Sequence, residues 1–541
     1  MNIKFLNILL CILLFSISDI NSYDLGVITV SAIKNKNIDD KIFSIKEQQF
    51  SNLDIISNEQ FLNRQINLQE ILETISGVQV KRYGSRDDFA TISIRGSSSE
   101  QIAYFIDGIQ TNNLLGGGFN ISELPGDAID RIEIYKSSAP FTFGGQSLAG
   151  VLNIKTLDIL KTKSNLSYSF GSFDYKNLQL NYSKIFNKIS MLLNIQYISA
   201  KNNFEFLNDN RTQFYRDDDF RDTRKNNDFQ KLYFLSKLNY RINETEIVKF
   251  ILLQRLENKG LTGPTYKITE NSRLKNNDLT LQTCYSKKNI FGLTADFEGA
   301  IFSKFTTDKF FDPKAELGLL QRDTNDKTQD IGGKLDFSIL PINYWKTNLN
   351  INIHKVKFKP TDKFDNQLYL DQKRVEKKLA FENNFFLLND KLILTPGLLF
   401  EKIDNSVMPQ RKPIIAKPQY FSNETLISKQ LGFNYKLTQD FTIKSTIGEY
   451  YRAPNIYELF GDYGFITGNV SLKPERSNNF DIGILYKYKY NDWQMFFDLS
   501  IYQRKVKDMI QWLAYTTQII YPDNIGSAEI KGIENNLTLK Y

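Results

Sequence analysis

Beyond Thr156 the chain shows a long series of segments in which apolar residues alternate with polar ones. A period of two predicts β-strands with one apolar and one polar face. Representative apolar positions are Leu166, Tyr168 and Phe170; Met191, Leu193, Ile195 and Tyr197; Leu349, Ile351 and Ile353; and Phe480, Ile482, Ile484 and Tyr486. A soluble β-sandwich gives similar alternation in shorter strands. The length of these runs and their aromatic ends therefore favour a transmembrane β-barrel.

The N-terminal residues 1–22 have the pattern of a secretory signal peptide. Lys4 supplies a positive start, and the apolar run 5–17 follows it. This run is too short to span a bilayer as a helix. We expect cleavage after Ser18 or Ser22, and a retained membrane anchor is the alternative.

A second apolar stretch, Leu25–Ser31, lies in the otherwise polar segment 23–38. An exposed β-prone run in a mobile terminus can pair with a strand of a partner protein by β-strand addition. The alternative is that this run forms the first strand of the next domain.

Residues 39–156 combine helix and strand patterns. Asn67 and Glu70 have the spacing of a capping box, and Gly77 can end the helix that they begin. The residues that share one face of this helix are Leu68, Ile71, Leu72 and Ile75. A strand over Val78–Arg82 should follow, so this part of the chain predicts a compact α+β domain.

Three apolar runs joined by Gly- and Ser-rich turns complete this domain. The first run ends at Arg95-Gly96, and the second ends at Asp107-Gly108, a strong turn dipeptide. Residues 131–135 alternate charged and apolar side chains, as a strand with one wet face does.

Four segments here resemble, in order and spacing, the plug domain of TonB-dependent outer-membrane receptors. They are Ile94-Arg95-Gly96, Phe105-Ile106-Asp107-Gly108, Arg131-Ile132-Glu133-Ile134 and Gly150-Val151-Leu152-Asn153-Ile154. The resemblance singles out Arg95, Gly96, Asp107, Gly108, Arg131, Glu133, Gly150 and Asn153. The sequence departs from the family at Lys136-Ser137-Ser138, where Arg-Gly-Pro is usual, so we expect an altered turn there.

Two later segments also resemble the receptor family, in its barrel. One combines Tyr451–Leu459 with Leu472–Glu475, and the other combines Asn524–Gly526 with Ile530–Glu534. Family barrels contain about 22 strands, and several strands normally follow the second signature. The barrel is therefore expected to be smaller here or C-terminally truncated, although Tyr541 ends an alternating run in the manner of an outer-membrane assembly signal.

The resemblance implies an all-β, antiparallel transmembrane barrel with an α+β plug in its lumen. The expected order is a signal peptide (1–22), a flexible segment with the TonB box at Leu25, Gly26, Val27, Ile28, Thr29, Val30 and Ser31 (23–38), the plug (39–156) and the barrel (157–541). It also implies active uptake of a scarce ligand across the outer membrane of a Gram-negative bacterium. The TonB energy-transducing complex is the implied partner, and the plug and N-terminus of the monomer would face the periplasm.

The ligand is expected to bind to outward turns of the plug and to barrel loops. The plug candidates are Tyr83, Arg86, Asn112, Asn113, Phe119 and Asn120. The plug layout is most similar to the cobalamin receptor branch of the family. A ferric siderophore or another metal chelate is the alternative ligand.

Composition argues against several other functions. The formal charge of +7 comes from 68 basic and 61 acidic residues that are spread along the chain, so no nucleic-acid footprint is present. His354 is the single histidine, and the sequence has neither a phosphate-binding glycine loop nor a nucleophile elbow. We therefore expect no cofactor and no enzymatic activity, and the plug argues against a passive porin.

One acidic cluster raises the question of calcium. Asp217, Asp218, Asp219, Asp222 and Asp228 lie in an expected extracellular loop. Calcium is bound by six to eight oxygen ligands, which several carboxylates can supply. The alternative is a solvated loop, because arginines interrupt the cluster at Arg216, Arg221 and Arg224.

Charges on the plug strands predict contacts with the barrel wall. Arg95, Arg131 and Glu133 lie on or beside strands whose other residues are apolar. An enclosed charge needs an opposite partner, and Glu458 and Glu475 are available in the barrel. The alternative is that these plug charges face the periplasm and are solvated.

Overall fold

The structure is a computed structural model of the chain. It describes residues 36–58, 68–84, 88–113, 115–116, 118–124, 126–144, 147–159, 162–212, 214–290, 294–318, 320–364, 370–409, 420–462, 466–514 and 519–541. The expected signal peptide and TonB box lie outside these residues. The chain divides into two compact units, 1–44 and 45–541, and helix α2 (Lys36–Gln48) crosses the boundary.

The plug contains two small sheets. The larger has the strand order β1-β6-β7-β4-β5, in which β4 and β7 are parallel, and the smaller pairs β2 with β3. Its strands are β1 (Asn52–Ser57), β2 (Val78–Arg82), β3 (Ala90–Ile94), β4 (Ile102–Ile106), β5 (Ile109–Gln110), β6 (Ile129–Lys136) and β7 (Gly150–Thr156). Its helices are α3 (Leu68–Leu72) and the 3-10 turns η2 (Ser99–Gln101), η3 (Ile121–Glu123), η4 (Gly126–Ala128) and η5 (Phe141–Phe143).

Helix α3 is shorter than the sequence predicts. Beyond Leu72 the backbone continues in turns, with Thr74 N–H donating to Ile71 O and Ile75 N–H donating to Leu72 O. Three-residue spacing of these bonds tightens the chain into a 3-10-like end. Gly77 then has φ +72°, the left-handed conformation expected of a terminator.

The apolar face of this helical segment packs in the main core of the plug. The four predicted face residues are all buried there, together with residues of β3, β4, β6 and β7. Tyr104 and Phe119 are in the same core, with ring centroids 5.4 Å apart. This packing holds the sheets and α3 together as one body.

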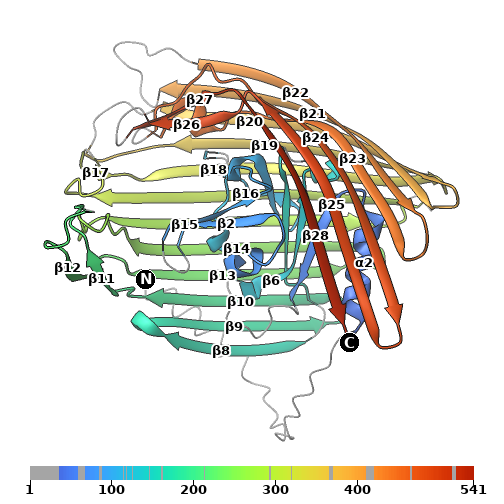
Figure 1. Ribbon diagram of the computed structural model, residues 1–541, viewed down its shortest axis with the longest axis horizontal. Helices are drawn as coiled ribbons and strands as arrows, with labels where there is room; N and C mark the ends of the chain where they lie inside the picture. Colours follow the sequence, from blue (N-terminus) through green and yellow to red (C-terminus); the bar gives the residue numbers. More distant parts are fainter. Residues whose placement is uncertain are drawn as a thin grey trace, which may run out of the picture. The chain divides into compact units, whose positions relative to one another are not determined.

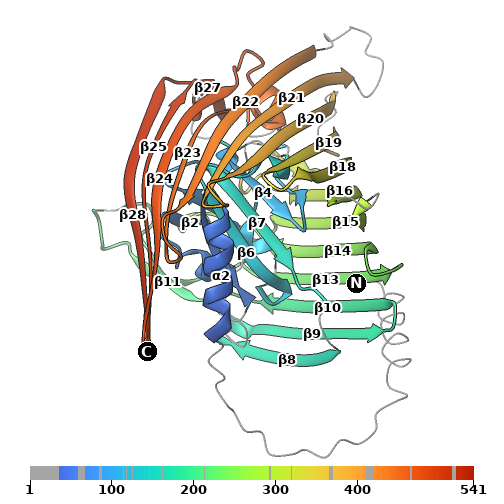
Figure 2. The same ribbon diagram turned by 90° about the vertical axis from the view of Figure 1, so that its right-hand side faces the viewer.

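Seventeen strands of the described residues form one antiparallel barrel sheet, fewer than the roughly 22 strands of large plugged transporters. They are β8 (Lys163–Gly171), β9 (Tyr175–Phe186), β10 (Ile189–Ala200), β13 (Phe229–Arg241), β14 (Glu246–Gly260), β15 (Arg273–Lys287), β16 (Ala295–Asp312), β17 (Arg322–Asp323), β18 (Asp326–Ile342), β19 (Trp345–Lys359), β20 (Leu370–Leu387), β21 (Leu392–Pro409), β22 (Tyr420–Lys436), β23 (Phe441–Arg452), β24 (Glu475–Tyr490), β25 (Trp493–Lys507) and β28 (Ser527–Lys540). Loop elements are η6 (Ser172–Asp174), α4 (Ile456–Phe460) and the hairpins β11 (Glu205–Asn208) with β12 (Phe220–Thr223) and β26 (Ile510–Ala514) with β27 (Ile520–Asn524). Figure 2 shows plug strands β4, β6 and β7 on the inner side of this curved sheet, and Figure 1 shows β2 and β6 there.

The predicted alternation is confirmed in the barrel strands. Along β24, Phe480 and Ile482 are exposed on the outer face, whereas Asp481 between them is buried on the inner face. Aromatic residues lie at one end of neighbouring strands, where the rings of Trp493 and Tyr541 are 4.9 Å apart. An apolar outer face with aromatic ends is the arrangement of a wall in contact with lipid. Among the described residues, no helix has the length and apolarity needed to cross a membrane.

Candidate functional site

Arg95 lies at a tight turn where β3 ends. Arg95 and Gly96 both have positive φ, at 51° and 71°, and the Arg95 N–H donates to Gly77 O at 2.8 Å. A Cβ added to Gly96 would meet nothing within 4 Å. Glycine is therefore favoured at position 96 for its conformation, since bulky residues adopt positive φ at a cost.

The Arg95 side chain crosses from the plug to the barrel wall and uses all five of its N–H donors. Nε and Nη2 bind the two oxygens of Glu534 at 3.0 and 2.9 Å. Nη1 binds Asp481 Oδ1 at 2.8 Å. The hydroxyls of Ser137 and Ser500 accept the two remaining donors, at 2.7 and 3.0 Å. The forked contact with Glu534 is the strongest geometry for a guanidinium and a carboxylate.

This charge is deeply enclosed. The Arg95 side chain is 2% exposed, and its guanidinium lies 3.9 Å from the centroid of the Tyr502 ring. Burial disfavours the charged form, but Asp481 and Glu534 outweigh it and raise the pKa of Arg95 above its usual value. The predicted contact between Arg95 and the barrel wall is confirmed. Its partners are Asp481 and Glu534 rather than the two acids suggested from the sequence, Glu458 and Glu475.

Further ion pairs extend this contact into a continuous chain of alternating charges. Lys136 joins Glu534, at 3.1 Å, to Asp54, at 2.8 Å. Lys46 joins Asp54, at 2.9 Å, to Asp498 of the wall, at 3.1 Å. We call the whole set the latch network: Asp481, Arg95, Glu534, Lys136, Asp54, Lys46 and Asp498. It connects the last turn of α2 to the turn at Arg95 through Asp54, Lys136 and Glu534, and it contacts the wall at Asp481, Asp498 and Glu534.

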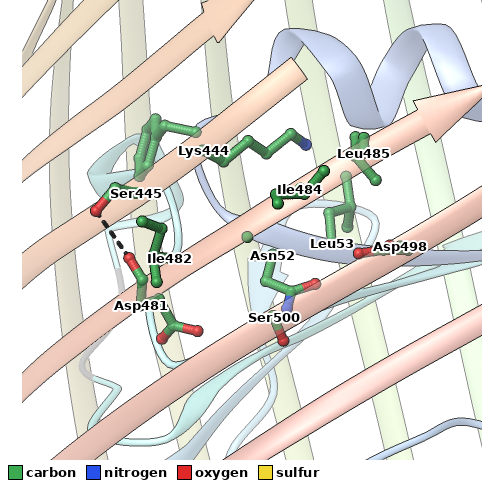
Figure 3. Close-up of a pocket in the computed structure, with 12 residues that line it drawn as sticks. Asn52, Leu53, Lys444, Ser445, Asp481, Ile482, Ile484, Leu485, Asp498 and Ser500 are labelled. Atoms are coloured by element: carbon green, nitrogen blue, oxygen red, sulfur yellow. Dashed lines mark hydrogen bonds between the residues drawn. The ribbon is translucent and has the colours of Figure 1, made fainter. Parts of the chain in front are cut away.

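The two lysines fix the charge of Asp54. Burial alone would raise the pKa of this carboxyl, but Lys46 and Lys136 outweigh burial and hold its pKa below the usual range. Figure 3 shows part of this interface, with Asn52 and Leu53 of β1 beside Asp498 of the wall. The gap there is only about 20 Å³, roughly the space of one water.

The segment that departs from the family pattern belongs to the latch network. Lys136 is 1% exposed, and Ser137 adopts φ +65° where the family usually has glycine. Ser137 O and Leu148 O accept hydrogen bonds from Asn479 of β24 at 2.8 and 2.9 Å. The altered turn therefore supplies a lysine and a hydroxyl to the plug–wall contact. Sequence reasoning missed Lys136, although it ends the strand that carries Arg131 and Glu133.

The two barrel acids proposed from the sequence have a different principal partner. Arg452 forms ion pairs with Glu458 at 3.0 Å and with Glu475 at 2.7 Å. Glu458 also completes a capping box with Asn455 at the start of α4. Glu475 contacts the plug weakly, through Gln101 Nε2 at 3.3 Å. These acids bind mainly within the wall and at the start of α4, and only weakly to the plug.

The other plug motif residues act inside the plug or at its edge. Arg131 Nε binds Glu133 at 2.7 Å, and the Arg131 side chain is 42% exposed, which agrees with the solvated alternative for this residue. Glu133 also accepts a hydrogen bond from Asn153 at 2.7 Å. A Cβ at Gly150 would approach Tyr135 O to 2.1 Å, so only glycine fits there without a shift of the backbone.

Asp107-Gly108 forms the turn between β4 and β5, with φ +47° and +84°. Positive φ at both positions is the geometry that this dipeptide favours. The Asp107 carboxylate also contacts Lys237 of the wall at 3.1 Å.

A larger cavity, of about 70 Å³, separates the plug from strands β13–β18. It has space for roughly five waters. Ile106 and Ile109 line it on the plug side, and Leu253 and Phe302 line it on the wall side. The plug is thus less tightly packed against this part of the wall than at the latch network.

The expected ligand residues are arranged in different ways. Tyr83 is 66% exposed, and Asn113 is also exposed. Asn112 accepts from Tyr104 N and donates to Ile102 O, and Asn120 accepts from Ala90 N. Phe119 is buried in the plug core, and Arg86 lies outside the described residues. Tyr83 and Asn113 therefore remain the residues with accessible side chains.

The acidic loop does not assemble in the described residues into a metal site. Asp228 binds Arg273 at 2.8 Å, and Asp218 accepts a hydrogen bond from Thr212. Within the described parts of the chain, no three His, Cys, Asp or Glu residues are grouped so as to hold a metal ion. Calcium binding by this loop stays a prediction.

Comparisons with known proteins agree with both parts of the fold. The family model described as TonB-dependent Receptor Plug Domain matches residues 46–151, and that described as TonB dependent receptor-like, beta-barrel matches residues 128–541. The vitamin B12 transporter BtuB of Vibrio vulnificus (strain YJ016) is 22% identical over 477 residues, covering 86% of this chain and 68% of the relative. BtuB of Vibrio cholerae (strain M66-2) is 24% identical over 490 residues, covering 86% and 69%.

Solved structures share the fold at lower identity. The copper transporter OprC has a TM-score of 0.72 at 14% identity, covering 90% of this chain and 76% of the other. The alcaligin outer-membrane receptor FauA from Bordetella pertussis has a TM-score of 0.66 at 13% identity, covering 91% and 78%. At this identity the likeness concerns the fold.

Proposed function

Because this chain belongs to the TonB-dependent receptor family, we propose that it takes up cobalamin across the outer membrane by using energy delivered through TonB. The family is one of transporters and receptors rather than enzymes. The similarity to vitamin B12 transporters over most of the chain supports cobalamin as the ligand. The alternative is a ferric siderophore or another metal chelate, because the plug and barrel motifs are common to receptors of all these ligands.

The observation that carries an energy-dependent mechanism is the latch network. Seven charged groups join the plug to β24, β25 and β28, and their side chains are at most 18% exposed. Separating enclosed ion pairs leaves charges without partners, which costs several kcal/mol for each pair. Thermal motion alone will therefore open this plug only rarely.

The network also gives a route for an applied force. Lys46 is the member nearest to the expected TonB box in sequence, and it lies in the last turn of α2. A pull transmitted through the chain would separate Lys46 from Asp54 and Asp498 first. Asp54 would then hold Lys136 less firmly, and the contact of Lys136 and Arg95 with Glu534 would weaken in turn. The plug would next move toward the cavity facing β13–β18, where it is less tightly packed than at the latch network.

Uptake measurements test this proposal. Cells that lack their own cobalamin and siderophore receptors should accumulate labelled cyanocobalamin when they produce this chain, and only when TonB is present. Accumulation of a ferric siderophore without cyanocobalamin would instead establish the alternative ligand. Equal uptake with and without TonB would overturn the energy-coupled mechanism.

Ligand binding can be measured separately on the purified protein. Quenching of tryptophan fluorescence by cyanocobalamin and by ferric siderophores distinguishes the two ligand classes without transport. An exchange of Tyr83 to Ala is expected to weaken binding of the true ligand, because this exposed ring lies in an expected outward turn of the plug. Arg82→Ala is a suitable control, since this neighbouring residue forms an ion pair with Glu73 of the plug.

A further inference from the structure

Lysines gather on the outer face of strands β19, β20 and β21, which lie side by side in both views (Figures 1 and 2). Lys357 directly opposes Lys373 across β19 and β20, and Lys377 directly opposes Lys402 across β20 and β21. Lys355 lies next to the first pair on β19. We call Lys355, Lys357, Lys373, Lys377 and Lys402 the lysine patch. Their neighbours in sequence are mostly buried on the inner face, so the patch points away from the plug.

Such pairing is unfavourable for the isolated protein. Directly opposed side chains on antiparallel strands have Cβ atoms roughly 5 Å apart, and like charges in this position are destabilising. Asp404 approaches Lys377 to 4.0 Å. Asp371, the other outer-face acid near the patch, binds Lys359 at 3.6 Å. In the described part of the chain, no ion pair forms with Lys355, Lys357, Lys373 or Lys402.

Other outer-face lysines of the same wall are matched with acids. Lys287 opposes Glu246 and binds it at 2.6 Å, and Lys429 opposes Glu449 and binds it at 3.1 Å. The lysine patch has five cations and two nearby aspartates, of which Asp371 is already paired with Lys359. Anions from outside the chain would therefore be attracted to the patch and would offset the repulsion between its lysines.

The position of the patch indicates which anions are available. At one end, short connections at 343–344 and 388–391 join β18 to β19 and β20 to β21, whereas at the other end the connections at 360–369 and 410–419 are longer. Barrels have short periplasmic turns and longer extracellular loops, so the patch lies in the extracellular half under the orientation proposed above. Ile353 is exposed on the outer face opposite Lys377, and Phe400 and Leu398 are exposed directly below the patch on β21. The lysines thus border an apolar band at the level of lipid headgroups.

We propose that the lysine patch binds a lipid of the outer leaflet through two phosphate groups. Each opposed lysine pair forms one clamp for a phosphate. Lys373 and Lys377 are four residues apart on β20, which separates the clamps by roughly 13 Å. That distance suits a headgroup that carries a phosphate at each end of a disaccharide, and it exceeds the reach of a phospholipid with a single phosphate. The acyl chains of the lipid lie against the apolar band.

The test uses the purified full chain in a non-ionic detergent. Native mass spectrometry measures retention of a synthetic disaccharide lipid with two phosphates, of its form with one phosphate, and of inorganic pyrophosphate. The wild type is expected to retain the bisphosphorylated lipid most strongly. In the fourfold variant Lys357→Gln, Lys373→Gln, Lys377→Gln and Lys402→Gln, retention should fall at least about tenfold, since one lysine beside an anionic lipid surface contributes a factor of roughly five.

A matched variant removes the same charge from the opposite end of the barrel. It carries Lys184→Gln, Lys188→Gln, Lys287→Gln and Lys489→Gln, and it should retain the lipid like the wild type. Heat-modifiable migration in a gel confirms that both variants hold a folded barrel. Equal losses in the two variants, equal retention of the lipids with one and two phosphates, or displacement of the lipid by equimolar pyrophosphate would each overturn the proposal. None of these measurements depends on the transported ligand.

Discussion

The exchange Arg95→Ala should release the plug from one side of the barrel. It removes five hydrogen bonds and the cation shared by Asp481 and Glu534. Glu534 still has an ion pair with Lys136, at 3.1 Å, after the exchange. Asp481 loses its ion pair with Arg95, so the larger part of the cost comes from the buried charge of Asp481. Removing one partner of a buried ion pair costs about 3–5 kcal/mol. Because 1.4 kcal/mol is a factor of ten, the fraction of molecules with a displaced plug should rise by a factor of roughly 10² to 4 × 10³.

Antibiotic sensitivity reports this displacement in cells. A displaced plug lets antibiotics that are too large for porins pass the outer membrane, so cells with Arg95→Ala should become more sensitive than cells with equal amounts of folded wild type. Arg131→Ala is the matched control, because Arg131 is also a plug arginine but is 42% exposed and binds Glu133 within the plug. Unchanged sensitivity of the Arg95 variant would refute the role of Arg95 in the latch network. An equal increase in the Arg131 variant would show a general loss of plug stability instead.

Three further predictions address other parts of the mechanism. Thr29→Pro should abolish uptake and leave ligand binding intact, because proline removes a backbone N–H from the strand that would pair with TonB; normal transport would exclude Leu25–Ser31 as the coupling segment. Gly96→Val should misplace the Arg95 turn, since φ of +71° is strained for a β-branched residue, and faster proteolysis of the plug with reduced uptake would show it. The lowered pKa of Asp54 means that its contribution to plug attachment is complete above the unfolded-state value of 3.8 and is lost as the pH falls through the lower folded-state value. Plug release should therefore rise below about pH 4 in the wild type, and Asp54→Asn should remove that part of the pH dependence.

The alternation of apolar and polar residues determined the barrel strands and the direction in which each side chain points. A strand exposes successive side chains on opposite faces whatever its partners are. Asp481 is an example, since its place between Phe480 and Ile482 puts it on the inner face. The turns at Arg95-Gly96 and Asp107-Gly108 were also determined locally, because positive φ depends on the residue itself and its neighbours.

The helix at the start of the plug shows the limit of such local rules. The apolar face through Ile75 is present and buried, yet regular α-helix ends at Leu72. Hydrophobic spacing does not distinguish an α-helical turn from the tighter 3-10 turn when the same side chains reach the core. The tertiary structure, in which α3 lies against β2 and η3, decided between them.

The pairing of charges was decided by the tertiary structure alone. Arg95 and Glu534 are 439 positions apart in the chain, and their contact depends on the place of β28 in the barrel and of the plug inside it. Glu458 and Glu475 are also enclosed carboxylates, but they form ion pairs with Arg452. Coulomb attraction between enclosed groups acts over a few ångströms and carries no signature in sequence spacing. The sequence could therefore show that an enclosed arginine needs a carboxylate, and only the packing of the plug against β24, β25 and β28 selected which one.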